Sequence, residues 1–198
     1  MDAMSDPSIE TIVFMSGSQV GKTEVLLNAI GFYICHDPAP ILVLQPTLSM
    51  GQAFSKDRLA PMIRDTPALV GKVRDARSRD AHNTTMTKGY PGGQISIVGA
   101  NSAAGLASRP IRIVLADEVD RYPPSAGSEG DPVSLARKRA ATFHNRKLVL
   151  TSTPTIAGVS RIETAFEGSD QRRYFVPCPD CGEKDHLKWK NVQWPEGK

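Results

Sequence analysis

The amino-acid sequence predicts an α/β fold in which a mainly parallel sheet is covered by helices. Short segments rich in β-favouring apolar residues alternate along the chain with segments whose apolar residues recur at helical spacing. The apolar segments are hydrophobic throughout, rather than at every second position. This continuity is typical of strands that are buried on both faces of a parallel sheet.

The first half of the chain is expected to contain two strand–helix pairs. Residues 11–15 form the first strand, and residues 22–35 form the helix that follows it. The segment Asp37-Pro-Ala-Pro40 ends that helix, because proline cannot continue it. Residues 41–45 form the second strand, after which Thr47 is placed to cap a helix over residues 48–64.

The second half begins with a predicted hairpin, since residues 84–88 and 94–98 flank the turn signal Tyr90-Pro-Gly-Gly93. The remaining expected elements are a loop of small residues (99–108), a buried strand (111–116), a surface loop (123–130), a helix (131–144), a buried strand (147–151) and a helix (159–167). The composition changes near residues 168–173. We therefore expect one domain over residues 1–170 and a short appended segment over residues 171–198.

The composition is that of a folded intracellular protein. Of 198 residues, 40% are apolar and 23% are charged, close to the average for globular proteins. No apolar run reaches the ~20 residues of a membrane span, and the N-terminus has no signal-peptide pattern. The three cysteines are too few for a secreted disulfide framework. We expect a reducing compartment and no membrane partner.

The net charge of +3 is unevenly distributed along the chain. The first 53 residues are net acidic, whereas residues 54–90 and 121–198 are net basic. Such segregation suits binding to a polyanion, although ordinary surface scatter also produces it.

A glycine-containing loop between the first strand and the first helix is the strongest functional signal. It follows the phosphate-binding pattern G-x-x-x-x-G-K-[ST], except that serine occupies the first position. The loop consists of Ser16, Gly17, Ser18, Gln19, Val20, Gly21, Lys22 and Thr23. Its amides and the helix N-terminus would bind the β-phosphate of a nucleotide. Lys22 would neutralise the β- and γ-phosphates, and the Thr23 hydroxyl would bind Mg²⁺.

Two adjacent acids, Asp117 and Glu118, directly follow the predicted strand at 111–116. The carboxyl ends of parallel strands face the ligand crevice. We therefore expect Asp117 to hold Mg²⁺ and Glu118 to orient and activate the attacking water. A solvated strand end would also place acids here, but the phosphate-binding loop favours an ATPase site.

Three hydroxyl residues, Thr151, Ser152 and Thr153, end the predicted strand that begins at Lys147. Their hydroxyls could bond the γ-phosphate or the attacking water and report the nucleotide state to a neighbouring segment. A simple turn before Pro154 is the alternative interpretation.

Together these motifs resemble the ATPase motor of large terminase subunits from tailed phages, most closely the lambda-like GpA family. The matching segments are Ser-Gln-Val-Gly-Lys-Thr (18–23), Ala-Asp-Glu-Val-Asp-Arg-Tyr-Pro (116–123) and Thr-Ser-Thr-Pro (151–154), with further likeness at residues 1–7 and 106–110. The resemblance covers nearly the whole chain. It implies a P-loop NTPase fold of the additional-strand type and an ATP- and Mg²⁺-dependent motor that packages double-stranded DNA into procapsids.

The resemblance also implies roles and partners. Glu118 and Lys22 would be catalytic, Thr23 and Asp117 would bind Mg²⁺, and Thr151, Ser152 and Thr153 would form the coupling motif. The partners would be double-stranded DNA, the terminase small subunit, the portal of the procapsid and further copies of the motor in a ring, all in the host cytoplasm.

The sequence departs from the family pattern in two respects. Many terminases carry an arginine in the phosphate loop, which this loop lacks. Arg109 is a candidate for that role, in cis or across a subunit interface, although a surface arginine is an equal interpretation. The resemblance also implies a fragment, with an adenine-pocket segment and a nuclease domain outside it. DNA cleavage is therefore not assigned to this chain.

The segment Cys178-Pro-Asp-Cys181-Gly182 resembles the first half of a zinc ribbon. Tetrahedral Zn²⁺ needs four ligands, and His186 is a candidate for the third. We expect Cys178 and Cys181 to bind zinc in the intact protein and residues 171–198 to begin a zinc-ribbon-like linker.

Two other functions fit the same residues. Asp117-Glu-Val-Asp120 and Thr151-Ser-Thr153 also resemble motifs of superfamily 2 helicases, which would need a second motor domain. Alternatively, the chain binds nucleotide or DNA without hydrolysis, because the loop arginine and the adenine-pocket segment are missing.

Overall fold

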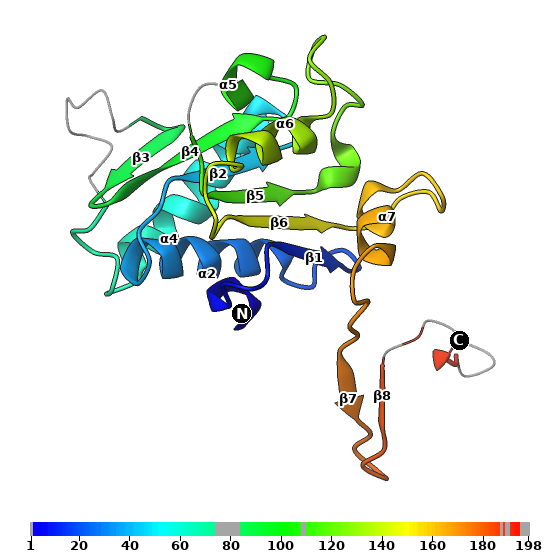
Figure 1. The fold of residues 1–198 in the computed structure, drawn as a ribbon. Coiled ribbons are helices and arrows are strands. Elements are labelled where there is room, and N and C mark those ends of the chain that lie inside the picture. The colour runs from blue at the N-terminus through cyan, green and yellow to red at the C-terminus, as the bar shows by residue number, and fades with distance from the viewer. Residues whose placement is uncertain (1, 74–83, 108–109, 187, 189–190, 195–198) are drawn as a thin grey trace.

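A computed structural model of the protein describes residues 2–73, 84–107, 110–186, 188 and 191–194. The larger sheet contains β1 (Thr11–Met15), β2 (Ile41–Gln45), β3 (Thr87–Tyr90), β4 (Gly93–Gly99), β5 (Ile113–Asp117) and β6 (Lys147–Ser152). Its strand order is β1-β6-β5-β2-β4-β3 (Figure 1). All neighbouring pairs are parallel except β3 and β4, which form the predicted antiparallel hairpin. The predicted mainly parallel α/β sheet is thus confirmed.

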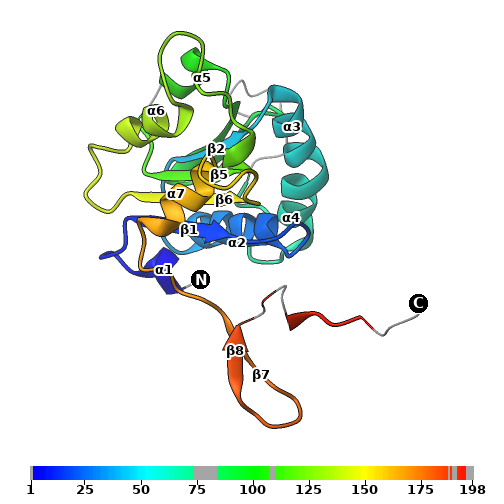
Figure 2. The same cartoon turned by 90° about the vertical axis from the view of Figure 1, so that its right-hand side faces the viewer.

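Helices cover both faces of this sheet (Figures 1 and 2). One face carries α1 (Asp2–Ser5), α2 (Lys22–Cys35), α3 (Leu48–Ala53), the π-helix η1 (Phe54–Leu59) and α4 (Ala60–Asp65). The other carries α5 (Ala103–Ala107), the 3-10 turn η2 (Val119–Arg121), α6 (Pro132–Arg139) and α7 (Arg161–Glu167). In β2, Ile41 and Val43 pack on the first face and Leu42 and Leu44 on the second. This alternation explains why the buried strands are hydrophobic at every position.

Five elements differ clearly from the sequence-based expectation. The first strand of the hairpin, expected over residues 84–88, is β3 at Thr87–Tyr90. Residues 99–108 contain α5, whose Leu106 is buried against the sheet. Helix α6 ends at Arg139 rather than near residue 144, because the Ala140 amide bonds two carbonyls of the preceding turn and tightens it. The predicted helix over residues 48–64 is continuous but passes through η1 in its middle. Helix α1 was not predicted.

The C-terminal residues form a separate two-stranded hairpin of β7 (Phe175–Pro177) and β8 (Lys184–His186). It follows α7 and extends away from the larger sheet in both views (Figures 1 and 2). Its start coincides with the composition break, while the division into two domains stays a prediction. Within the described part of the chain, no helix is long and apolar enough to cross a membrane.

Candidate active site

The three predicted motifs meet at one edge of the larger sheet. The phosphate-type loop leaves β1, the acid pair ends β5, and the hydroxyl residues end β6, which lies between those two strands. The parallel register pairs Met15 with Ser152 and Asp117 with Thr151. Because the carboxyl ends of these strands coincide, segments far apart in the sequence become neighbours.

The backbone of the loop leaves room for a ligand. Gly21 has a φ of 85°, a left-handed conformation that glycine adopts without strain. A Cβ added at Gly17 or Gly21 would meet no atom within 4 Å. Gly21 is the N-cap residue of α2. Because glycine has no side chain, no side chain of the N-cap residue bonds the first backbone amides of the helix. These amides and the positive end of the α2 dipole can therefore receive an anion.

The side chain of Lys22 is the centre of the site. It is only 6% exposed, and its ammonium group donates hydrogen bonds of 2.8 Å to the Gly17 carbonyl and 2.8 Å to the Thr153 hydroxyl. The Lys22 Nζ also lies 3.8 Å from Oε1 of Glu118. One cation thus contacts all three predicted motifs. Its two hydrogen-bond acceptors are neutral, so a phosphate oxygen would compete well for the ammonium group.

The Asp117 carboxylate is held by residues from three other elements. The buried Thr151 hydroxyl donates to Oδ1 over 2.7 Å. The Thr23 hydroxyl and the Gln45 side-chain amide each donate to Oδ2 over 3.4 Å. The two predicted Mg²⁺ ligands, Thr23 and Asp117, therefore lie side by side. Hydroxyl and carboxylate oxygens are the donors that Mg²⁺ prefers, so this pair fits the metal.

Glu118 lines a cavity together with Asp117. Its backbone is left-handed, with a φ of 55°, which is uncommon for a residue with a side chain. Its Oε2 lies 3.7 Å from Nε of Arg121. The cavity has a volume of about 310 Å³ and is lined by Thr23, Gln45, Asp117, Glu118 and Arg121, with Met50, Ala53, Phe54, Asp57 and Arg58 on the α3–η1 side. Water can therefore reach Glu118 from the cavity.

Each of the three hydroxyl residues that end β6 contacts another part of the site. Thr151 bonds Asp117, and Thr153 accepts from Lys22. The Ser152 hydroxyl accepts a hydrogen bond of 3.2 Å from the Asp120 amide. The structure thus brings all three to the motifs, and their coupling role stays a prediction.

Sequence reasoning missed Gln45, Asp120 and Arg121 as parts of the site. The strand-end rule that singled out Asp117 applies equally to Gln45, which ends the buried strand β2. Asp120 and Arg121 lie in the segment that resembles terminase and helicase motifs, but the sequence assigned them no role, because their contacts depend on how η2 turns after β5. Arg109 lies outside the described residues.

The two cysteines lie in the turn between β7 and β8. The Cys178 amide donates to the Glu183 carbonyl over 2.8 Å, and the Gly182 amide donates to the Cys178 carbonyl over 2.9 Å. Hydrogen bonds from the amides of Cys181 and Asp180 lower the pKa of the Cys178 thiol. The structure does not bring His186 to this pair. It lies opposite Phe175, and no cluster of three metal-ligating side chains occurs among the described residues.

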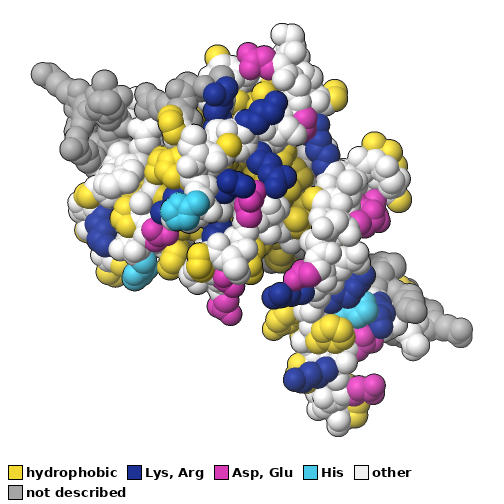
Figure 3. Space-filling view, viewed as in Figure 1, with side chains coloured by type: hydrophobic (Ala, Val, Ile, Leu, Met, Phe, Trp, Pro, Cys, Tyr) yellow, Lys and Arg dark blue, Asp and Glu magenta, His cyan; other side chains and the backbone are white. Residues whose placement is uncertain are grey.

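A basic surface covers the end of α6 (Figure 3). We define the α6 basic surface as Arg137, Lys138, Arg139 and Arg146. Arg137 and Arg146 share one partner, Glu10, at 3.0 and 2.7 Å, which leaves the surface with a net positive charge. A hollow of about 430 Å³ is lined by Arg137, Lys138 and Arg146 together with Ser134 and Ala141.

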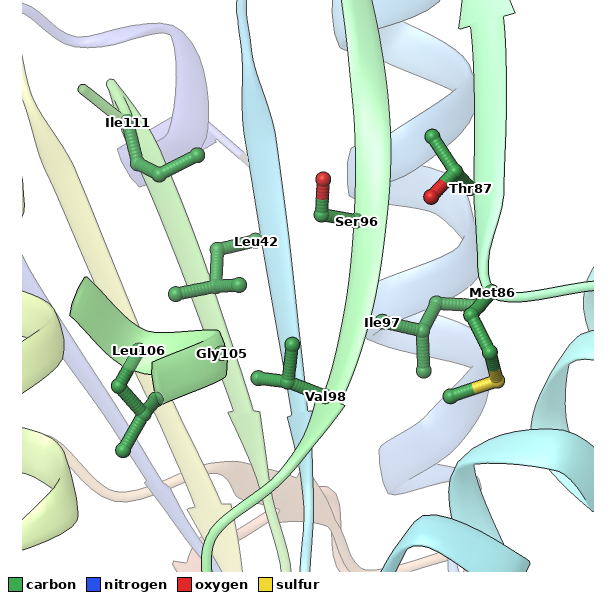
Figure 4. A pocket seen from close by; sticks show the side chains of 9 residues that line it. All are labelled: Leu42, Met86, Thr87, Ser96, Ile97, Val98, Gly105, Leu106 and Ile111. Carbon is green, nitrogen blue, oxygen red and sulfur yellow. The ribbon is translucent and has the colours of Figure 1, made fainter. Parts of the chain in front are cut away.

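A second cavity, of about 180 Å³, lies on the α5 side of the sheet (Figure 4). Its lining residues are Leu42, Met86, Thr87, Ser96, Ile97, Val98, Gly105, Leu106 and Ile111. None of these residues is titratable. Leu42 and Ser96 are register partners near the start of β2, away from the edge where the motifs meet. This cavity is therefore not part of the site.

Comparisons with known proteins identify the family of the chain. Residues 1–198 match the family profile described as phage terminase large subunit gpA, ATPase domain. The terminase large subunits of Enterobacteria phage P21 and Escherichia phage lambda are 31% and 28% identical to the chain. Each alignment covers 100% of this chain and 31% of the relative, so the chain spans about a third of their length.

A solved structure shares the fold. The large terminase ATPase domain of Thermus phage P74-26 superimposes with a TM-score of 0.59 and 14% identity. The match covers 90% of this chain and 72% of that chain. Because the profile match runs along the entire sequence, the chain belongs to the gpA family of phage terminase large subunits, within the portion that the family describes as its ATPase domain.

Proposed function

We propose that this chain is the ATP-hydrolysing motor module of a terminase large subunit, which drives double-stranded DNA into a procapsid. Membership of the family supports the ATPase activity. The observation that carries the proposal is the position of Lys22, whose ammonium group lies 2.8 Å from Thr153 and 3.8 Å from Glu118. The family match also favours this function over a helicase.

We assign the fold to the additional-strand type of P-loop NTPase. The position of β6 between β1 and β5 supports this assignment, because it inserts one strand between the phosphate loop and the acid pair. The phosphates of ATP would bind the amides of the loop and the start of α2. Lys22 would exchange its bonds to Gly17 and Thr153 for phosphate oxygens.

Thr23 and Asp117 would hold Mg²⁺, since their oxygens lie 3.4 Å apart. The metal would neutralise charge on the β- and γ-phosphate oxygens. Thr151, which donates to Asp117, would fix the orientation of that carboxylate.

Glu118 would accept the proton of the attacking water from its place at the cavity. Lys22 would stabilise the charge that develops on the transferred phosphoryl group. Arg58 and Arg121 line the same cavity and are candidates for the cation that the loop lacks. Thr151, Ser152 and Thr153 would then report the phosphate state to the residues that follow β6.

Double-stranded DNA would contact the α6 basic surface. Phosphate contacts by arginine and lysine need no base sequence, which suits a motor that moves any DNA. On this proposal the other partners are the terminase small subunit, the portal of the procapsid and further copies of the motor in a ring, in the host cytoplasm.

Cys178 and Cys181 would bind Zn²⁺ together with ligands from outside the described residues. The tight turn between β7 and β8 and the lowered pKa of Cys178 support a thiolate pair. On this proposal residues 1–170 form the motor domain and residues 171–198 begin a zinc-ribbon-like linker. Measuring the zinc content of the purified protein beside that of Cys178→Ser tests it, and equal contents would contradict it.

The ATPase proposal is tested by nucleotide binding and phosphate release. We expect Glu118→Gln to bind Mg²⁺-ATP like the wild type while phosphate release falls to background, and Lys22→Ala to lose binding. Glu129→Gln is the matched control, because it removes an exposed acid that does not line the cavity of the site. Wild-type phosphate release by Glu118→Gln would contradict the assignment of the catalytic acid.

A further inference from the structure

We propose that Asp120 is a positioning residue, which holds Glu118 in place and ties it to the segment after β6 and to α7. This inference rests on the proposed function. It adds to that function a positioning residue and a structural connection from the phosphate site to α7. Asp120 lies two residues after Glu118 in the short turn η2. Its contacts reach three other parts of the chain.

The backbone and the side chain of Asp120 bind different elements. Its amide donates to the Ser152 hydroxyl at the end of β6, over 3.2 Å. Its Oδ2 accepts from the amide and the hydroxyl of Thr155, each at 3.0 Å. Its Oδ1 accepts from the Ile162 amide in the first turn of α7, at 2.9 Å. One residue therefore fastens η2 to β6, to the 153–160 segment and to α7.

The charge of Asp120 suits these contacts. Burial raises the pKa of its carboxyl, but hydrogen bonds from Ser160, Ile162 and Thr155 outweigh this effect and lower the pKa below its ordinary value of 3.8. The carboxylate is therefore ionised at neutral pH. A negative charge at the start of α7 is also stabilised by the helix dipole.

The contacts of Asp120 help to keep the strained backbone of Glu118 in its conformation. A residue in the left-handed region keeps that conformation only where its surroundings hold it. The η2 turn, which directly follows Glu118, restrains its backbone. Within η2, the Asp120 amide bonds β6 and the Asp120 carboxylate bonds α7. Loosening Asp120 would let the Glu118 carboxylate move relative to Lys22.

The same contacts form a route from the phosphate site. Lys22 bonds Thr153, and Thr155, two residues further along, bonds Asp120. When the Lys22 ammonium group donates to a phosphate oxygen instead, Thr153 loses its hydrogen-bond donor. A shift of residues 153–155 would then reach Asp120 through its hydrogen bonds to Thr155. From Asp120 it would pass to α7 through the Ile162 hydrogen bond and to Glu118 along the backbone of η2. Helix α7 leads directly to the β7–β8 hairpin.

Hydrogen–deuterium exchange on the full chain tests the route. We expect Mg²⁺ with a non-hydrolysable ATP analogue to slow exchange in residues 16–23 and to change exchange in residues 153–167. In Asp120→Asn the first effect should remain and the second should disappear. The matched control is Glu163→Gln. Glu163 lies in the first turn of α7, like Ile162, and its carboxylate accepts from the Gly158 amide in the segment before that helix. It should keep both effects.

Steady-state kinetics test the effect on Glu118. We expect Asp120→Asn to lower kcat by about 10- to 100-fold, as a small displacement of a catalytic group does. The KM for ATP should change by less than about twofold, because ground-state binding is intact. Thr155→Val, which removes the hydroxyl donated to Asp120, should lower kcat in the same direction but less. Asparagine keeps the size and one acceptor oxygen of aspartate, so melting curves should show a folded variant.

Two results would overturn the inference. The first is an Asp120→Asn variant with wild-type kcat and an unchanged nucleotide response in residues 153–167. The second is a wild-type chain in which the analogue leaves exchange in residues 16–23 unaltered. That second result contradicts the proposed function itself, and the inference falls with it, so the two failures are distinguishable.

Discussion

At the scale of single residues, the site depends on side chains that are buried and nevertheless polar. Lys22 and Asp117 are 6% and 5% exposed, and Thr151 is fully buried. Burying a charge is costly unless hydrogen bonds compensate. Thr151 donates such a bond to Asp117, and Lys22 donates to Gly17 and Thr153, so both charged groups are held in fixed orientations. On the proposed function, these orientations are set before phosphates or a metal ion bind.

Removing the hydroxyl of Thr151 should weaken metal binding. Thr151→Val is close to isosteric, but it deletes the 2.7 Å hydrogen bond to Asp117. We expect the Mg²⁺ concentration for half-maximal ATP hydrolysis to rise about tenfold, as is usual when a group that orients a metal ligand is lost. Titrating Mg²⁺ at saturating ATP measures this change. Thr151→Ser restores the hydroxyl and serves as the control; an unchanged Mg²⁺ requirement in Thr151→Val would contradict the assigned role.

The site residues that could be identified from the sequence are those at positions where the chemistry allows only one or two residue types. A phosphate loop needs glycine and lysine, and a metal site needs carboxylates, so Lys22 and Asp117 can be recognised in the sequence. Gln45 and Asp120 were missed because their contacts exist only once β2, β5 and β6 lie together.

At the scale of elements, α6 presents its basic surface to solvent. Arg137 and Lys138 are exposed in its last turn, where cations also stabilise the C-terminal end of a helix. If this surface binds DNA, each phosphate contact releases counterions, so that affinity falls as salt rises.

Neutralising this surface should therefore reduce the salt dependence of DNA binding. For the double variant Arg137→Ala and Lys138→Ala, we expect the slope of log K against log salt to lose about 1 unit per phosphate contact. Fluorescence anisotropy with labelled duplex DNA at several salt concentrations measures it. Arg172→Ala is the control, because Arg172 is exposed and already pairs with Asp170. A slope equal to that of the wild type would show that DNA binds elsewhere.

A helix or strand could be predicted where a single sequence signal, such as an apolar run or a capping residue, determines it. Continuous apolar runs identified β2, β5 and β6, and Thr47 caps α3 as expected. Helix α5 was not predictable, because the small residues of 99–108 have no periodicity, and its stability comes from packing of Leu106. Strand order was not predictable from the residues themselves, because it depends on how the crossovers pack.

At the scale of the whole molecule, three tyrosines are buried in or beside the core. Burial raises the pKa of Tyr33 to about 12 and also raises the pKa of Tyr90 and Tyr122. The hydroxyls of Tyr33 and Tyr122 donate to backbone carbonyls of Met4 and Leu44 over 2.8 and 2.9 Å. Each phenol is thus held in its neutral form in the folded state.

The protein should therefore lose stability at alkaline pH. An unfolded tyrosine ionises near pH ~10, whereas these buried tyrosines stay protonated, so the folded state binds more protons in this range. We expect the free energy of unfolding to be constant with respect to these groups below pH ~10 and to fall as the pH rises further. Urea unfolding between neutral and alkaline pH measures it, and Tyr33→Phe should flatten the fall. A pH-independent stability would contradict the burial of these phenols.

We propose that ATP hydrolysis in this module is coupled to DNA. The most direct test is phosphate release from Mg²⁺-ATP by the purified chain and by Glu118→Gln, with and without linear duplex DNA. We predict that DNA increases phosphate release by the wild type and that Glu118→Gln releases none under either condition. Release that is unaffected by DNA, or that persists in Glu118→Gln, would contradict the account of a DNA-coupled motor built around Lys22 and Glu118.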